Sequence, residues 1–132
     1  MIIRIDMQSH IPIYEQIRDQ IVLGIAVKAL VPDEILPSVR RLAADLGVHF
    51  HTVNKAYALL RDEGYVKVYG RKGAVVAKPP VADEAFIKEM ESTLLKLMAE
   101  AKSKGMEPAE VVRLAENLSK TEEFRKKKGE WE

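Results

Sequence analysis

Two short amphipathic helical patterns meet at a single glycine in the segment LPSVRRLAADLGVHFHTVNKAY, residues 36–57. The first pattern covers residues 39–46 and follows Ser38, a residue type that accepts hydrogen bonds at helix starts. The second covers about residues 50–63. Gly47 between them can adopt the positive φ that ends a helix within one residue. Helices joined by so short a turn must cross steeply, so the segment predicts a helix-turn-helix.

Segments on both sides of the helix-turn-helix have patterns of their own. An apolar stripe at helical spacing predicts a first helix over about residues 12–28, with Ser9 or His10 at the position of its cap. Residues 29–37 contain two prolines and predict a turn or a brief strand. Apolar and polar residues alternate on both sides of the basic GRKG tip at 70–73, which predicts a β-hairpin. These elements in this order are typical of a winged helix.

A Lys-Pro-Pro stretch at residues 78–80 precedes two further helical patterns, over about 83–104 and from Pro108 onward. Each pattern has a wide apolar stripe, and two helices cannot enclose a hydrophobic core by themselves. A second copy of the chain is the simplest partner, because a two-fold interface uses one surface twice. The predicted dimer interface consists of Phe86, Met90, Leu94, Leu97, Met98, Val111, Leu114 and Leu118.

The predicted fold is therefore α+β, mainly α with a small β-hairpin. We expect an N-terminal winged helix-turn-helix over residues 1–78. A linker and a C-terminal α-helical dimerisation region, a two-helix hairpin, are expected over residues 79–132. The chain has 21 Lys and Arg against 20 Asp and Glu, and the basic excess precedes the linker. A basic face can therefore be present in a nearly neutral chain.

Composition excludes several classes of protein. With 47% hydrophobic and 31% charged residues, the chain is typical of a folded globular protein. It contains no cysteine, which excludes disulfides and thiolate metal sites and favours the cytoplasm. No signal peptide and no run of about 18 apolar residues is visible, so no membrane partner is expected. We also find no constellation that indicates catalysis, and we predict neither an enzyme nor a cofactor.

Three strings of residues resemble the winged-helix domain of GntR-family transcriptional regulators. They are PIYEQIRDQI at 12–21, ILPSVRRLAADLGV at 35–48 and TVNKAYALLRDEGYV at 52–66. The short C-terminal region resembles the YtrA-type subgroup, whose C-terminal helices form the dimer and whose members often regulate operons for ATP-binding-cassette transporters. The resemblance implies a cytoplasmic, homodimeric repressor that binds a palindromic operator in double-stranded DNA.

The resemblance also implies roles for individual residues. Arg40, at the arginine of the LPSxR motif, would contact DNA, and Asn54 stands where many relatives have an arginine. General physical reasoning agrees, because a recognition helix presents its N-terminal side chains to the major groove, where arginine reads guanine and asparagine can pair with adenine. Phe50 departs from the family's polar pattern and could touch a thymine methyl group. The predicted DNA-binding residues are Ser38, Arg40, Arg41, His49, Phe50, His51, Thr52, Asn54, Lys55, Arg71 and Lys72.

Other interpretations of these residues stay open. His49 and His51 could bind a metal ion, but side chains two residues apart at a helix start are expected to point differently and no third ligand adjoins them. We therefore predict no metal site. Phe50 could pack into the core instead of facing DNA. The two basic residues of the hairpin tip depart from the family's glycine pattern and could belong to a solvated turn.

Two further alternatives concern Arg40 and the whole chain. Arg40 could form a surface salt bridge with Asp45 or Glu34. The winged helix could bind another protein and not DNA, since a fold does not fix a function. The sequence leaves open whether a small-molecule effector acts, and with so short a C-terminal region its pocket would lie at the dimer interface or between the domains.

Overall fold

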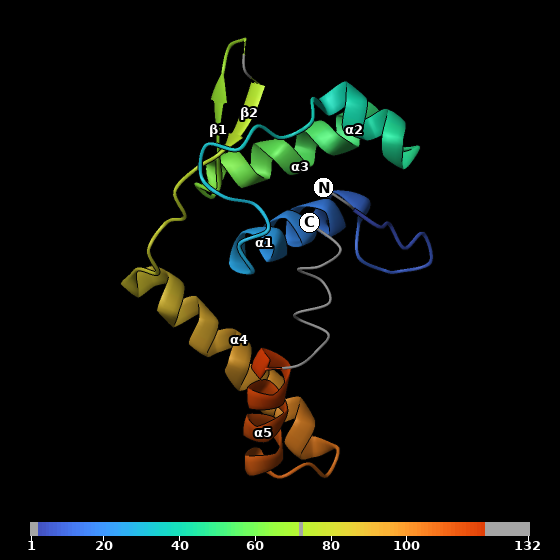
Figure 1. Ribbon diagram of the computed structural model, residues 1–132. Coiled ribbons are helices and arrows are strands. Elements are labelled where there is room, and N and C mark those ends of the chain that lie inside the picture. The colour runs from blue at the N-terminus through green and yellow to red at the C-terminus, as the bar shows by residue number, and fades with distance from the viewer. Residues whose placement is uncertain (1–2, 72, 121–132) are drawn as a thin grey trace. The chain divides into compact units, whose positions relative to one another are not determined.

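The computed structural model describes residues 3–71 and 73–120, and the chain divides after Pro80 into an N-terminal unit and a C-terminal unit. The N-terminal unit contains, in chain order, α1 (Ile13–Ala26), α2 (Val39–Leu46), α3 (Phe50–Asp62), β1 (Val66–Tyr69) and β2 (Gly73–Val76). α3 contacts each of α1, α2 and β1. Figure 1 shows α1 beside α3, α2 at the N-terminal end of α3 and the hairpin at its C-terminal end. This arrangement confirms the predicted winged helix-turn-helix.

The core of the N-terminal unit lies between α1, α3 and the hairpin. Its fully buried side chains are Ile17 and Ile21 on α1, Val53 and Leu60 on α3, and Val76 on β2. Spacings of four and seven residues place each helical pair on one face of its helix. The apolar stripes that the sequence predicts for these two helices therefore face inward.

Ser38 and Gly47 set the two ends of α2. The Ser38 hydroxyl accepts a hydrogen bond of 3.1 Å from the backbone N–H of Arg41. Gly47 has φ 68° and ψ 33°, and the N–H of Val48 donates to the carbonyl of Ala43 at 3.0 Å. A side chain at position 47 would meet no atom within 4 Å, so the backbone conformation and not a lack of space demands glycine. The predicted cap and turn are confirmed.

The hairpin gains a third backbone segment from the chain before α2. β1 and β2 pair antiparallel, with Tyr69 opposite Gly73 next to the tip. Ile35 forms an isolated bridge with Val75, and backbone hydrogen bonds join residues 33–36 to β2. The predicted turn or brief strand is thus present as a single bridge, which ties the entry of α2 to the wing.

The start of α1 differs from the prediction. Pro12 is the N-cap residue, and it makes no side-chain hydrogen bond to the helix. The Ser9 hydroxyl accepts instead from the N–H of Ile11 at 3.1 Å, in the turn that precedes the helix. The prediction of Ser9 or His10 as the cap was wrong, because the chain makes one more turn before the helix begins. The helix also ends two residues earlier than expected, and Lys28 has a positive φ of 61°.

Two glutamines on α1 hold the N-terminal segment along the helix. The side-chain oxygen of Gln16 accepts from the N–H of Asp6 at 2.8 Å, and its amide donates to the Asp6 carbonyl at 3.0 Å. Gln20, one turn further on, makes the same pair of bonds with Arg4, at 2.9 and 2.6 Å. Each side-chain amide thus satisfies both backbone groups of one residue, as a neighbouring strand would.

The C-terminal unit consists of α4 (Glu84–Ser103) and α5 (Pro108–Lys120), which contact each other. Gly105 has a φ of 91° in the turn between them. Neither helix contains a buried residue, and large apolar side chains such as Phe86 and Leu97 are 52% and 54% exposed. Within the described part of this unit, the apolar stripes therefore have no hydrophobic core to enter.

Two valines on β1 allow a matched test of the core. Val66 is 2% exposed and Val68 is 56% exposed. Val66→Ala is expected to lower the free energy of unfolding by about 1.5–3 kcal/mol, because it removes buried methyl groups and leaves a cavity. Val68→Ala should change that free energy by less than about 0.5 kcal/mol. Urea unfolding followed by circular dichroism measures both, and equal losses would contradict the inward orientation of Val66.

Candidate nucleic-acid interface

Three aromatic rings stack at the start of α3. His49 is the N-cap residue, and its Nδ1 atom accepts a hydrogen bond of 3.2 Å from the N–H of His51. The ring centroids of His49 and His51 lie 4.8 Å apart, and that of Phe50 lies 5.0 Å and 4.1 Å from them. The expectation that the two histidines point differently was wrong, because capping folds the His49 ring back over the first turn.

The crossing of α2 and α3 brings Arg40 onto this stack. Its guanidinium carbon lies over the Phe50 ring, 5.4 Å from the centroid, at the distance of a cation–π contact. Phe50 itself is 38% exposed, so it does not belong to the core. Among the described residues, no ion pair joins Arg40 to Asp45 or Glu34. We call Arg40, His49, Phe50 and His51 the aromatic–arginine cluster.

The other residues of α3 that were predicted to bind DNA lie on two different sides of the helix. Asn54 is exposed and lies four residues after Phe50, so both share one face of the helix. Thr52 is half-buried, and its N–H donates to the carbonyl of His49 at 3.0 Å. Lys55 lies toward α1, with its ammonium nitrogen 4.1 Å from the centre of the Tyr14 ring. The structure thus gives Lys55 an intramolecular partner that the sequence did not indicate.

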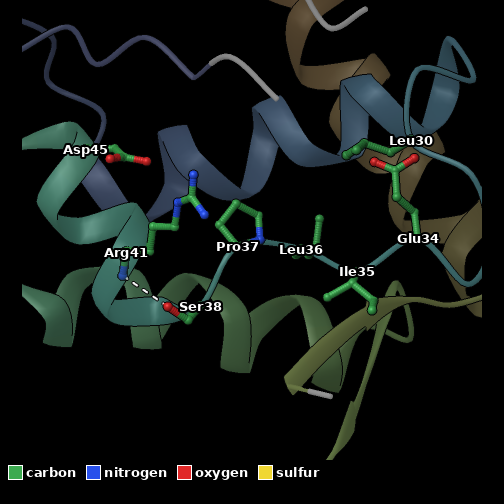
Figure 2. A pocket seen from close by; sticks show the side chains of 8 residues that line it. All are labelled: Leu30, Glu34, Ile35, Leu36, Pro37, Ser38, Arg41 and Asp45. Atoms are coloured by element: carbon green, nitrogen blue, oxygen red, sulfur yellow. Dashed lines mark hydrogen bonds between the residues drawn. The ribbon is translucent and has the colours of Figure 1, made fainter. Parts of the chain in front are cut away.

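On α2, Arg41 lies apart from the aromatic–arginine cluster. Figure 2 shows its side chain on the side of α2 that carries Asp45, while the nearby Ser38 hydroxyl bonds the Arg41 backbone. Both residues line a pocket of about 580 Å³ within the N-terminal unit. Its lining residues are Leu30, Glu34, Ile35, Leu36, Pro37, Ser38, Arg41 and Asp45.

The remaining predicted contacts lie at the hairpin tip. Arg71 is exposed, and Lys72 lies outside the described residues. Within residues 3–71 and 73–120, no group of three or more histidine, aspartate or glutamate side chains is placed to hold a metal ion. In the same ranges, no helix has both the length and the apolar character needed to cross a bilayer.

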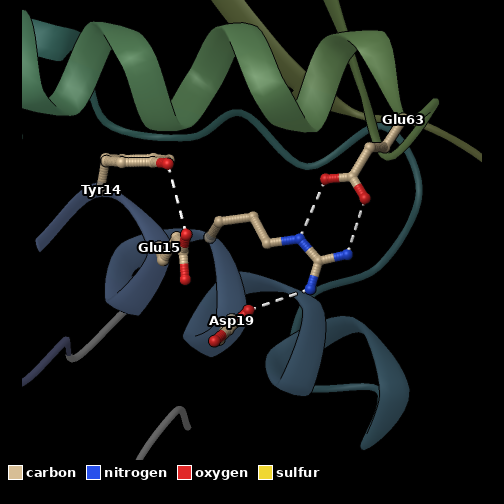
Figure 3. A network of polar contacts seen from close by, with 5 residues as sticks. Tyr14, Glu15, Asp19 and Glu63 are labelled. Carbon is tan, nitrogen blue, oxygen red and sulfur yellow. Dashed lines mark hydrogen bonds and ion pairs between the residues drawn. The ribbon is translucent and has the colours of Figure 1, made fainter. Parts of the chain in front are cut away.

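An ion-pair network fastens the C-terminal end of α3 to α1. Arg18 donates two hydrogen bonds to the Glu63 carboxylate, at 3.0 and 2.8 Å, and one of 2.9 Å to Asp19. Figure 3 shows the Glu63 and Asp19 carboxylates at the two ends of this network. These bonds, chiefly those to Glu63, raise the pKa of Arg18 above its usual value. Arg18 also lies 5.7 Å from the centre of the Tyr65 ring, at the entry of the hairpin.

Tyr57 connects α3 to the start of α2. Its hydroxyl donates a hydrogen bond of 2.7 Å to the carbonyl of Pro37, directly before Ser38. Burial raises the pKa of Tyr57 above its usual value, so the hydroxyl stays a donor. The sequence indicated only that Tyr57 faces inward. This bond ties the start of α2, the helix that carries Arg40, to α3, which carries Phe50 at its start.

A family model and a curated relative that match this chain both describe transcriptional regulators. The family model described as "Bacterial regulatory proteins, gntR family" matches residues 13–76. The chain is 36% identical over 84 residues to the HTH-type transcriptional regulator Rv1152 of Mycobacterium tuberculosis, an alignment that covers 64% of this chain and 69% of that protein.

Two solved structures extend these matches to three dimensions. YtrA from Sulfolobus acidocaldarius, a GntR-family transcription factor, is 41% identical with a TM-score of 0.65, over 75% of this chain and 99% of that chain. The DNA-binding domain of AraR, solved in complex with operator ORX1, is 28% identical with a TM-score of 0.51, over 56% of this chain and 92% of that chain.

Proposed function

Because the chain belongs to the GntR family of transcriptional regulators, we propose that it binds a palindromic operator in double-stranded DNA as a homodimer and represses transcription from it. The aromatic–arginine cluster carries this proposal. It gathers an arginine, a phenylalanine and two histidines at the exposed N-terminal end of α3. The N-terminal end of a recognition helix is the part that enters the major groove.

The two units have separate tasks in this proposal. Residues 1–78 bind DNA, and residues 79–132 link and dimerise the chain. Six of the eight predicted interface residues are exposed, and the two half-buried ones are Met98 and Val111. A soluble protein rarely leaves so much apolar surface in contact with water. A second copy of α4 and α5 would cover it and would bury the same residues on both chains.

A two-fold dimer also determines the form of the operator. Two copies of α3 related by a two-fold axis read inverted half-sites, whose centres lie about 34 Å apart in the simplest geometry. Around each half-site, helix N-termini, the hairpin tip and Arg71 supply contacts to phosphates, which hold the register but carry little sequence information. We place this activity in the cytoplasm.

Arg40 offers the most direct test of this DNA-binding site. Arg40→Ala is expected to weaken operator binding by about 1–3 kcal/mol for each half-site, because each copy in the dimer loses a bidentate contact to guanine. Fluorescence anisotropy with the operator and with single-base variants measures the loss at each position. Discrimination should relax at one base pair of each half-site, whereas a phosphate contact would lower affinity evenly across all sequences.

Arg61→Ala provides the matched control for this test. Arg61 lies near the C-terminal end of α3, is exposed and pairs with its neighbour Asp62 at 3.3 Å. Its removal should leave operator affinity within about twofold of the original, since an exposed pair contributes little. If Arg40→Ala keeps both affinity and specificity, Arg40 does not belong to the interface.

A further inference from the structure

The Phe50 side chain is held in place without being buried. The His49 ring stacks on it, the His51 ring packs against it at a tilt, and the Arg40 guanidinium lies over it. It nevertheless remains 38% exposed at the end of the helix that enters the groove. An exposed aromatic side chain fixed by three neighbours loses little conformational freedom when it meets a ligand. The structure therefore presents a preorganised apolar contact.

The major groove contains one apolar group that such a contact can recognise. Phenylalanine has no hydrogen-bond donor or acceptor, so it cannot read the polar edges of the bases or hold a phosphate. The C5 methyl group of thymine projects into the major groove and is the natural target of an apolar side chain there. A 5-methylcytosine carries its methyl group on the same ring carbon.

Arg40 lies close enough to read the neighbouring base pair. Its guanidinium carbon is 5.4 Å from the Phe50 centroid, and successive base pairs of B-DNA are about 3.4 Å apart along the axis. No hydrogen bond or ion pair occupies the Arg40 side chain among the described residues. Its donors are thus available for the O6 and N7 acceptors of guanine.

We propose that Arg40 and Phe50 together read two adjacent base pairs, in which Phe50 contacts the methyl group of a thymine and Arg40 contacts the guanine of the next pair. This inference rests on the proposed DNA-binding function and names the sequence step that the cluster selects. A 5-methylcytosine in place of the thymine would keep the contact with Phe50, because it presents the same methyl group. The pair acts as a unit, since Arg40 packs on the ring that touches the methyl group.

Base analogues in the operator test each half of the proposal with the 132-residue chain. Uracil replaces thymine without its methyl group, and 7-deazaguanine replaces guanine without its N7 acceptor. Replacing one thymine in each half-site by uracil should weaken binding roughly 15-fold, because the dimer loses two methyl contacts and each is worth about fourfold in affinity. A 5-methylcytosine–guanine pair at that position should bind more tightly than the unmethylated pair by a similar factor.

Two variants assign these effects to the named side chains. Phe50→Ala should bind the thymine and uracil operators equally, and Arg40→Ala should bind the guanine and 7-deazaguanine operators equally. Uracil at thymines elsewhere in the operator is the internal control, and thermal unfolding by circular dichroism confirms that each variant folds. If Phe50→Ala does not fold, the uracil scan of the unaltered protein decides the question.

The possible outcomes separate this inference from the proposed function. A sensitive thymine next to a sensitive guanine, with both sensitivities lost in the matching variants, supports it. Tight binding to an operator in which no thymine methyl group matters, or in which the sensitive bases are not adjacent, overturns the inference while the proposed function stands. If no duplex is bound at any salt concentration, both fail.

Discussion

Deletion of residues 81–132 is expected to lower affinity for the palindromic operator by about 10²- to 10⁴-fold, the range that linking two binding modules usually adds. The N-terminal unit should still fold, because its buried residues, such as Ile17, Ile21 and Leu60, all precede the cut. The deletion removes the connection between the two N-terminal units of the dimer. The second unit then has to bind its half-site from solution, and binding is no longer intramolecular. Sedimentation equilibrium and anisotropy titrations of the shortened chain measure the two effects.

A half-site duplex is the control for this deletion. Its affinity should change little, since one N-terminal unit makes all of its contacts. In the full chain, Leu94→Glu should reproduce the deletion because it places a charge on the proposed interface, whereas Lys96→Glu, two residues along the same helix, should not. A shortened chain that still sediments as a dimer would show that residues 83–120 do not hold the two copies together.

Operator affinity is also expected to fall by about 10³- to 10⁵-fold between 50 and 200 mM salt, if the dimer makes 6–10 phosphate contacts. Each cation that neutralises a phosphate releases condensed counterions, and added salt opposes that release. Arg71→Ala should reduce the slope of log K against log salt by about two, one for each copy in the dimer. Anisotropy titrations at four or more salt concentrations give the slopes.

This salt dependence separates DNA binding from the alternative of a winged helix that binds only protein. A protein-binding module does not release the counterions of a polyanion, so its affinity would respond weakly to salt. A flat response with duplex DNA would count against the DNA-binding function. A steep response without sequence preference would keep DNA binding and remove the operator-specific role of α3.

The main elements of the fold could be predicted because local patterns determine them. Gly47 ends α2, Ser38 caps it, and the buried stripe of α3 follows helical spacing, all within one or two residues of the prediction. The cap of α1 could not be predicted in this way. Its N-terminal segment depends on Gln16 and Gln20, which bond residues ten and sixteen positions earlier in the chain.

The sequence predicted which residues lie together at the candidate site, but it did not predict how they are arranged. The pattern of residues placed Arg40, Phe50 and the histidines at one end of α3, but no local rule shows that three rings stack there under a guanidinium. Lys55 illustrates the same limit, because its direction matters only once the position of Tyr14 on α1 is known. Contacts between elements depend on how the helices pack, and composition and spacing do not contain that information.

α3 is attached to the rest of the N-terminal unit at points away from its own N-terminal end. This has a consequence for how such regulators can acquire new operator preferences. Lys55 contacts the ring of Tyr14 on α1. Glu63, directly after α3, accepts two hydrogen bonds from Arg18. Val53 and Leu60 are buried in the core. None of these residues belongs to the exposed group at positions 49–51. Substitutions at positions 50 and 51 can therefore accumulate without loosening the helix, provided that position 49 keeps a side chain that caps it. New operator preferences are open to this scaffold at little cost in folding.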